Sequence, residues 1–123
     1  MNVLIADDDA LNVAILSKFF TARGIEVTTA YDGQEALEKF KQDHYVLVIT
    51  DIVMPKVEGI EIIGEIRSQS NNIKIIAMSS DADAGRSSLL KIAETMGANL
   101  CLKKPISAEM LAEALESLGI HTL

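Results

Sequence analysis

The chain has 123 residues, of which 49% are hydrophobic and 4% aromatic, and its formal net charge is −7 at pH 7. This length suits one domain with an aliphatic core, and the acidic balance argues against a nucleic acid or an anionic membrane as partner. The single cysteine excludes an internal disulfide, and no signal pattern or apolar run of ~20 residues occurs, so we expect a cytoplasmic protein.

Short apolar runs alternate with stretches whose apolar residues recur at helical spacing, which predicts five strands and five helices. The expected strands are Val3–Ala6, Ile25–Ala30, Val46–Asp51, Ile73–Met78 and Leu100–Leu102. The expected helices follow them in turn, with buried faces at Leu11, Ala14, Ile15, Leu16 and Phe19; Ala36, Leu37 and Phe40; Ile60, Ile62, Ile63 and Ile66; Leu89, Leu90, Ile92, Ala93 and Met96; and Leu111, Ala114, Leu115 and Leu118. Strict alternation of this kind predicts an α/β fold with a parallel sheet and helices on both faces.

Three local signals mark where helices begin. Asp8 or Asp9 is placed to cap the first helix, which explains one acid of the triplet Asp7-Asp8-Asp9 but not three, because adjacent like charges repel. Asp32 begins a D-x-x-E capping-box pattern. Ser107 is the expected cap of the last helix, which a hydrophobic staple would support.

Polar residues follow four of the five expected strands. The first strand ends in Asp7 and Asp8, the third in Asp51, the fourth in Ser79 and the fifth in Lys104. The carboxyl ends of parallel strands lie at one edge of a sheet, and one doubly wound order, 2-1-3-4-5, places the first and third strands side by side. The three acids would then lie close together.

Such an acidic cluster needs a cation, because two carboxylates ~4 Å apart repel by about 1–4 kcal/mol. An all-oxygen ligand set suits Mg²⁺ or a similar hard divalent ion. Lys104 adds an ammonium group and Ser79 a hydroxyl donor. Together these groups favour a site for a phosphoryl group, with the carboxylate of Asp51 as the candidate nucleophile.

Four segments in this order resemble the response-regulator receiver domain, the phosphoacceptor module of two-component signalling. They are Ile5–Asp9, Asp51–Gly59, Ser79-Ser80 and Lys104-Pro105, and the resemblance covers essentially the whole chain. It implies a single receiver domain over residues 1–123 with a flavodoxin-like, doubly wound, five-stranded parallel sheet of order 2-1-3-4-5. It also implies phosphoryl transfer from the phosphohistidine of a histidine kinase or phosphotransfer protein, and an unidentified downstream protein partner.

The resemblance implies a role for each acid. Asp51 matches the aspartate that is phosphorylated. Asp7 and Asp8 match the acidic pair that binds Mg²⁺, with Asp51 and the backbone carbonyl of Val53 as further ligands.

The resemblance also implies roles on the other side of the site. Ser79 and Lys104 match the residues that contact the phosphoryl group, and the peptide bond before Pro105 is expected to be cis. Cys101 stands where family members usually carry an aromatic residue that turns inward during switching. We therefore expect the signal to be transmitted by a backbone shift of residues 79–85; the alternative is that Cys101 is a buried core residue and the switch lies elsewhere.

The main alternative is an enzyme. The Asp7-x-Asp9 spacing superficially resembles haloacid-dehalogenase phosphatases, which also use an aspartyl-phosphate, but Ala10-Leu11 follow where that pattern has a small residue and Thr. A flavin-binding module is disfavoured because no phosphate-cradling loop follows the first strand. We expect a monomer or weak dimer. Either a stand-alone protein or a segment of a larger one fits, although Met1 directly before the first strand favours a natural amino terminus.

Overall fold

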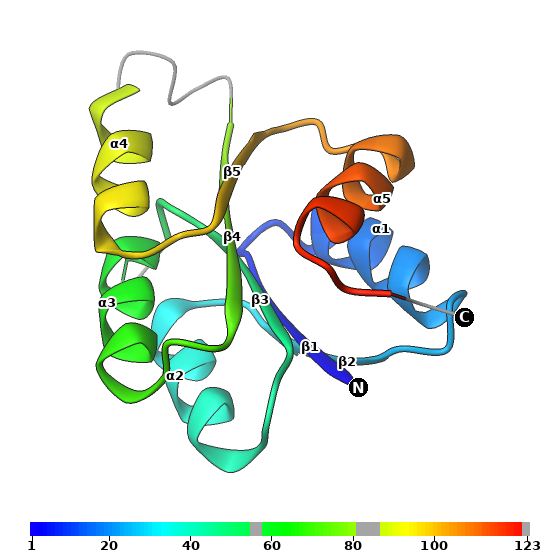
Figure 1. The fold of residues 1–123 in the computed structure, drawn as a ribbon, viewed down its shortest axis with the longest axis horizontal. Coiled ribbons are helices and arrows are strands. Elements are labelled where there is room, and N and C mark those ends of the chain that lie inside the picture. The colour runs from blue at the N-terminus through cyan, green and yellow to red at the C-terminus, as the bar shows by residue number, and fades with distance from the viewer. Residues whose placement is uncertain (55–57, 81–86, 122–123) are drawn as a thin grey trace.

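The computed structural model describes residues 1–54, 58–80 and 87–121 (Figure 1). Within these ranges five strands alternate with five helices, in the order that the sequence predicts. The strands are β1 (Asn2–Ala6), β2 (Glu26–Ala30), β3 (Leu47–Asp51), β4 (Lys74–Ser79) and β5 (Leu100–Lys103). The helices are α1 (Ala10–Thr21), α2 (Gly33–Gln42), α3 (Gly59–Gln69), α4 (Ser87–Met96) and α5 (Ala108–Ser117).

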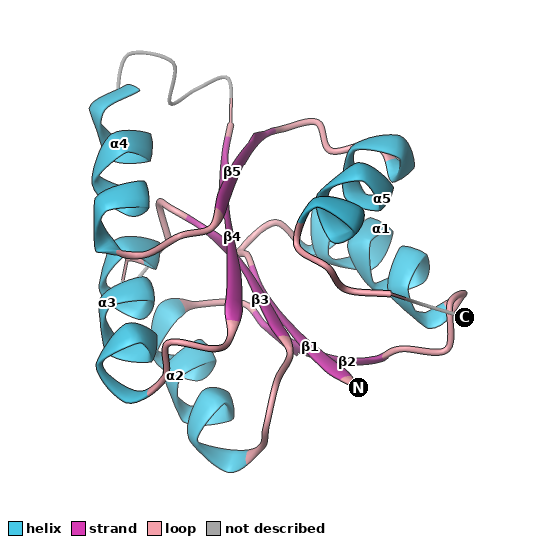
Figure 2. Cartoon of the chain, viewed as in Figure 1, coloured by secondary structure: helices cyan, strands magenta, loops and turns pink. Residues whose placement is uncertain are grey.

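The strands form one sheet of order β2-β1-β3-β4-β5, and every neighbouring pair is parallel. Helices α1 and α5 cover one face of the sheet, and α2, α3 and α4 cover the other (Figures 1 and 2). This is the predicted doubly wound α/β fold, with the predicted strand order. It places β1 beside β3 at the point where the strand order reverses, which is where open α/β sheets build their sites.

The sheet is buried on both faces because helices pack on each side. Along β1, Val3 and Ile5 join the cluster under α1 and α5, whereas Leu4 and Ala6 join the cluster under α2, α3 and α4. All five residues of β3 are buried. A continuous apolar run is what a doubly covered parallel strand requires, so the run that ends at Asp51 marks the centre of the sheet.

Local capping sets the start of three helices. Asp9 caps α1 by accepting hydrogen bonds from the backbone N–H groups of Leu11 and Asn12. Asp32 caps α2 and Ser107 caps α5 in the same manner, each accepting an N–H from three residues ahead. These contacts confirm the predicted helix starts, and of the two acids considered for α1 the cap is Asp9.

The predicted buried face of α1 is partly wrong. Leu11 is 71% exposed and Ile15 is 51% exposed, and Ala14 is exposed as well. The face that packs on the sheet consists instead of Asn12, Val13, Leu16, Phe19 and Phe20. Apolar residues occupy two sides of this helix, so helical spacing alone does not identify the side that meets the sheet.

The predicted face of α4 needs the same correction. Ala93 is fully buried, but Ile92 and Met96 are 43% and 40% exposed. Leu89 and Leu90 lie outside the residues whose side chains are described.

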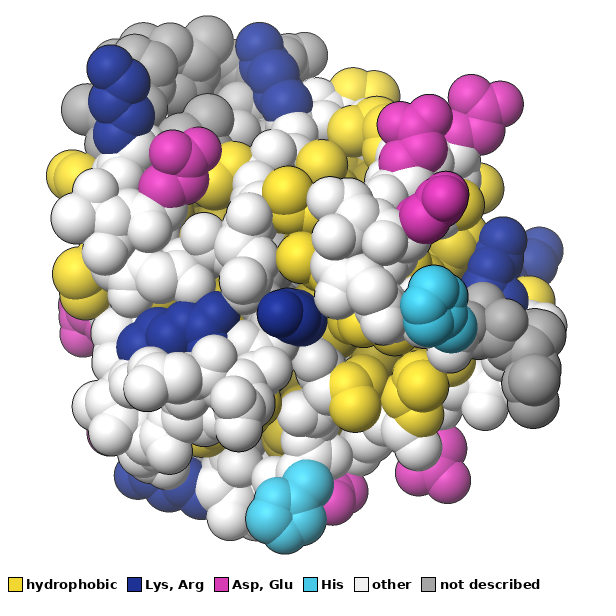
Figure 3. Space-filling view, in the orientation of Figure 1, with side chains coloured by type: hydrophobic (Ala, Val, Ile, Leu, Met, Phe, Trp, Pro, Cys, Tyr) yellow, Lys and Arg dark blue, Asp and Glu magenta, His cyan; other side chains and the backbone are white. Residues whose placement is uncertain are grey.

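Among the described residues, no helix combines the length and the apolarity needed to cross a bilayer. In the view of Figure 3, acidic side chains gather over α5, beside exposed hydrophobic ones.

Candidate functional site

The carboxyl edge of the sheet brings the predicted polar residues together. Asp7 directly follows β1, Asp51 ends β3, Ser79 ends β4, and Lys104 directly follows β5. Asp7, Asp51 and Ser79 are buried, whereas Asp8 is exposed. The register pairs Asp51 with Met78, which places the acid beside the strand end that carries Ser79.

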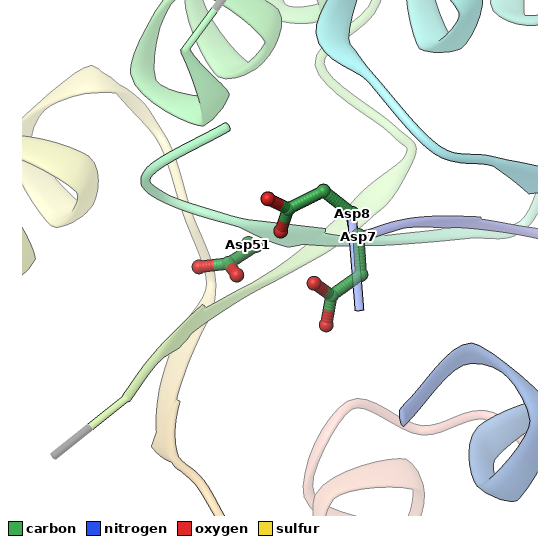
Figure 4. Close-up of side chains that lie close together, drawn as sticks. All are labelled: Asp7, Asp8 and Asp51. Atoms are coloured by element: carbon green, nitrogen blue, oxygen red, sulfur yellow. The ribbon is translucent and has the colours of Figure 1, made fainter. Parts of the chain in front are cut away.

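Three carboxylates form the centre of the site. Asp7, Asp8 and Asp51 each offer an oxygen, and these atoms lie within 4.8 Å of one another. Figure 4 shows the three side chains grouped where β1 and β3 end. Two of the acids are buried and one faces solvent. The cluster therefore has two buried carboxylates that the fold holds in place, and a solvent-exposed side from which an ion or a phosphoryl donor can approach.

The ammonium group of Lys104 bridges the two buried acids. Its Nζ lies 2.7 Å from Asp7 Oδ2 and 2.9 Å from Asp51 Oδ2. The backbone N–H of Lys104 donates to the carbonyl of Ser79 at 2.7 Å, which fixes the end of β5 against the end of β4. The peptide bond between Lys104 and Pro105 is cis, as expected.

Asp7 is held by two further donors. The backbone N–H of Asp9 donates to Asp7 Oδ1 at 3.0 Å, and Nδ2 of Asn12 donates to Asp7 Oδ2 at 2.7 Å. Sequence reasoning did not single out Asn12. The sequence carried no signal for it, because helical spacing alone does not identify the buried side of α1, and Asn12 lies on that side only in the folded structure.

The two buried acids have pKa values shifted in opposite directions. Burial acts to raise the pKa of Asp7, but the hydrogen bonds from Lys104, Asp9 and Asn12 outweigh it and hold that pKa below its usual value. Burial raises the pKa of Asp51 to about 6 despite the attraction of Lys104, and the negative charge of Asp7 adds to the rise. The difference follows from the donors, because among the described residues Asp51 receives only the shared ammonium and a 3.4 Å contact from the N–H of Val53.

Lys104 is firmly cationic in this setting. Burial alone would lower its pKa, but its contacts with the carboxylates of Asp7 and Asp51 raise the pKa above the ordinary value for lysine. Among the described groups at the site, one ammonium faces three carboxylates, so it balances their negative charge only in part. The donor set is all oxygen, which fits a hard divalent cation such as Mg²⁺.

Gly59 allows the chain after β3 to return close to Asp51. Its N–H donates to the carbonyl of Ile52 at 2.9 Å. A Cβ atom at Gly59 would lie 1.9 Å from the backbone oxygen of Asp51, so no other residue fits without movement. Pro55, the proline that follows this strand in the sequence, lies outside the described residues. The start of α3 is therefore packed directly against the backbone that presents Asp51.

Cys101 lies on β5, opposite Ala77, and packs with the apolar cluster under α2, α3 and α4. Burial, with a contribution from the charge of Glu94, raises the pKa of its thiol to about 11. The thiol is therefore protonated at neutral pH. The segment proposed to carry the switch, residues 79–85, lies only in part within the described residues.

The chain matches known proteins along nearly its whole length. The sequence profile described as "Response regulator receiver domain" matches residues 3–116. The chain is 35% identical to the sensor protein EvgS of Escherichia coli O157:H7 over 118 residues, which cover 96% of this chain and 10% of EvgS. It is 32% identical to a probable chemotaxis protein CheY of Rhizobium etli, covering 95% of this chain and 91% of that protein. The chain thus spans about a tenth of the first relative and most of the second.

Solved structures show the same fold. A response regulator receiver domain protein from Clostridium thermocellum has a TM-score of 0.82 and 28% identity, over 95% of this chain and 92% of the other. The receiver domain of Ssk1 from Saccharomyces cerevisiae was solved with the histidine phosphotransfer signalling protein Ypd1. That match has a TM-score of 0.83 and 27% identity, over 97% of this chain and 88% of the other.

These comparisons support the predicted resemblance and give no support to the phosphatase alternative. The agreement extends from the strand order to the family profile, which covers β1 from Val3 onward, the other four strands and the acidic residues at the strand ends. The chain belongs to the response regulator receiver domain family, the signalling phosphoacceptor of two-component systems.

Proposed function

We propose that Asp51 accepts a phosphoryl group from the phosphohistidine of a histidine kinase or phosphotransfer protein, and that this modification changes the binding of a downstream protein. The observation that supports Asp51 is its position. It lies at the end of the central strand, 2.9 Å from the Lys104 ammonium and within the cluster formed with Asp7 and Asp8.

The chemistry is an in-line exchange of bonds at phosphorus. A carboxylate oxygen of Asp51 forms the new P–O bond while the P–N bond to the donor imidazole breaks, and the imidazole nitrogen keeps the electron pair. The product is an aspartyl-phosphate. A nucleophile must be ionised, and with a pKa of about 6 Asp51 is mostly a carboxylate at pH 7.

The surrounding residues neutralise the charge of the transferred group. The Lys104 ammonium already lies against Asp51, and the hydroxyl of Ser79 ends the neighbouring strand. Asp7, Asp8, Asp51 and the backbone carbonyl of Val53 would hold Mg²⁺, which supplies positive charge to the phosphoryl oxygens when it is bound. Asp7 and Asp8 contribute the carboxylates that make this site selective for a hard cation.

The proposal extends to the partners and setting of the chain. We propose a single receiver domain over residues 1–123 that acts in the cytoplasm as a monomer or weak dimer, with neither nucleic acid nor membrane as its partner. The complex between Ypd1 and the Ssk1 receiver supports a phosphotransfer protein as donor. The net charge of −7 supports the absence of an anionic partner.

The experiment is phosphorylation by acetyl phosphate with Mg²⁺, read by intact mass. The wild-type protein should gain one phosphate, and Asp51→Asn should gain none. Asp43→Asn is the matched control, because this acid follows α2, outside the acidic cluster, and accepts a hydrogen bond from Asn2. A stoichiometric phosphate on Asp51→Asn, or no phosphate on the wild-type protein, would contradict the proposal.

A further inference from the structure

We propose that Asn12 is a positioning residue for the cation site. Its side-chain amide fixes the carboxylate of Asp7 and thereby raises the affinity of the acidic cluster for a divalent ion. The inference rests on the proposed function of the cluster and goes beyond it, because Asn12 itself is not among the proposed ligands.

Asn12 is a buried polar residue in an apolar setting. It is 8% exposed and lies on the buried face of α1, beside Val13 and Leu16. A buried amide is costly unless it is hydrogen-bonded. Its Nδ2 donates to Asp7 Oδ2 at 2.7 Å and also lies 3.7 Å from the sulfur of Met78. The amide therefore connects α1 to the end of β1 and to the penultimate residue of β4.

The position of the amide is fixed by the start of the helix. Asp9 accepts the backbone N–H groups of Leu11 at 3.1 Å and Asn12 at 3.4 Å. The same residue donates its own N–H to Asp7 Oδ1. Asp9 and Asn12 thus hold both oxygens of Asp7 from one rigid turn, which sets the plane of the carboxylate.

The third donor to Asp7 differs from the other two. Lys104 contacts Asp7 Oδ2 and Asp51 Oδ2 together, so it is shared between the acids. In the proposed function Lys104 pairs with the phosphoryl group on Asp51, so its ammonium is not devoted to Asp7. Among its described contacts, the side-chain amide of Asn12 donates to Asp7 and otherwise contacts only the sulfur of Met78, so it is not shared with Asp51. It is the side-chain donor that can keep Asp7 oriented through the whole cycle.

The test measures Mn²⁺ binding by electron paramagnetic resonance, with Asn12→Ala and Asn12→Leu compared with the wild-type protein. Loss of a hydrogen-bonding partner behind a metal ligand typically lowers affinity about 10- to 100-fold, and we expect the dissociation constant to rise by that factor. Ser17→Ala is the matched control. Its buried hydroxyl lies on the same helix and has no hydrogen-bond partner among the described residues, so its removal should leave the dissociation constant unchanged.

A second readout separates positioning from a purely structural role. In acetyl phosphate reactions, the Mg²⁺ concentration that gives half the maximal rate should rise by the same factor. The rate at saturating Mg²⁺ should be largely retained, because Asp51 and Lys104 are untouched. Unfolding curves in EDTA establish that each variant is folded. Asn12→Ala places the best helix former in α1, so this variant still provides the test if the larger side chain of Asn12→Leu prevents folding.

The inference is overturned if folded Asn12→Ala binds Mn²⁺ as tightly as Ser17→Ala does. It is also overturned if neither Asn12 variant folds, because Asn12 would then be a residue required for folding. If the wild-type protein itself fails to bind Mn²⁺, the proposed function of the cluster fails, and this result is distinct from a failure of Asn12 alone.

Discussion

Replacing Asp51 by Asn should stabilise the metal-free protein at neutral pH, and the gain should depend on pH. Burial raises the pKa of Asp51 from 3.8 to about 6 in the folded protein. The folded pKa lies above the unfolded one, so the contribution of this carboxyl to stability is fully present below about pH 4. It is lost as the pH rises through the folded pKa, because the buried carboxylate is then ionised. Asn cannot ionise, so the variant avoids this loss.

The magnitude follows from the size of the shift. A rise of about two pKa units corresponds to a loss of roughly 3 kcal/mol of unfolding free energy in the wild-type protein between pH 4 and a pH above 6. Asp51 is buried, so solvent screens little of this effect. Asp7 does not confuse the result. Its pKa is lowered, so its contribution is present above 3.8 and is lost only as the pH falls through its folded pKa. Lys104 keeps Asp7 as a partner in the variant.

The assay is urea unfolding of both proteins in EDTA at several pH values. The difference in unfolding free energy between Asp51→Asn and wild type should widen from pH 4 to above pH 6. Other titrating groups cancel in this difference, and equal slopes against urea would establish that the unfolded states are comparable. A difference that stays constant over this range, or that narrows as the pH rises, would refute the reasoning.

Three further predictions follow from the geometry of the site and its supports. Mg²⁺ at 100 times its dissociation constant should raise the unfolding free energy of the wild-type protein by ~2.7 kcal/mol. In thermal melts Asp8→Ala should abolish that gain without destabilising the metal-free fold, because Asp8 is exposed. An equal gain in Asp8→Ala would contradict the metal site. Gly59→Ala should lower the unfolding free energy, measured in urea, by about 1–3 kcal/mol or more, because the new Cβ would lie 1.9 Å from the Asp51 backbone oxygen. Gly64→Ala is the control and should be tolerated, because its Cβ meets the flexible end of Met96. Arg67→Lys should lower the unfolding free energy by about 1.5–3 kcal/mol or more. The guanidinium of Arg67 donates to four acceptors, and one ammonium cannot reach all of them: the carbonyls of Ser70, Ile73 and Gly97, and Asn99 Oδ1. Unchanged stability would refute this role.

The order of elements and the chemical character of the site follow from the sequence because their signals are local. Alternation between strand and helix periods needs only neighbouring residues, and each capping residue acts on an N–H two or three residues ahead. The acids and the lysine stand directly at strand ends, as in Asp51 and Lys104. Parallel strands bring such ends to one edge, and the resemblance supplied the strand order that makes Asp7 and Asp51 neighbours.

The tertiary structure decided which side of a helix is buried. Both α1 and α4 carry apolar residues on more than one side, and exposed Leu11 and Ile92 have the same local pattern as buried residues. Only the fit of the whole helix against the sheet selects one side.

The tertiary structure also decided how the site residues act on one another. In the sequence Asn12 is one more residue of a helix, and its role depends on how α1 packs beside β1. Asp7 and Asp51 are chemically identical, yet three donors lower the pKa of one while burial raises the pKa of the other. Distance and burial determine these interactions, and residues far apart in the chain set both of them.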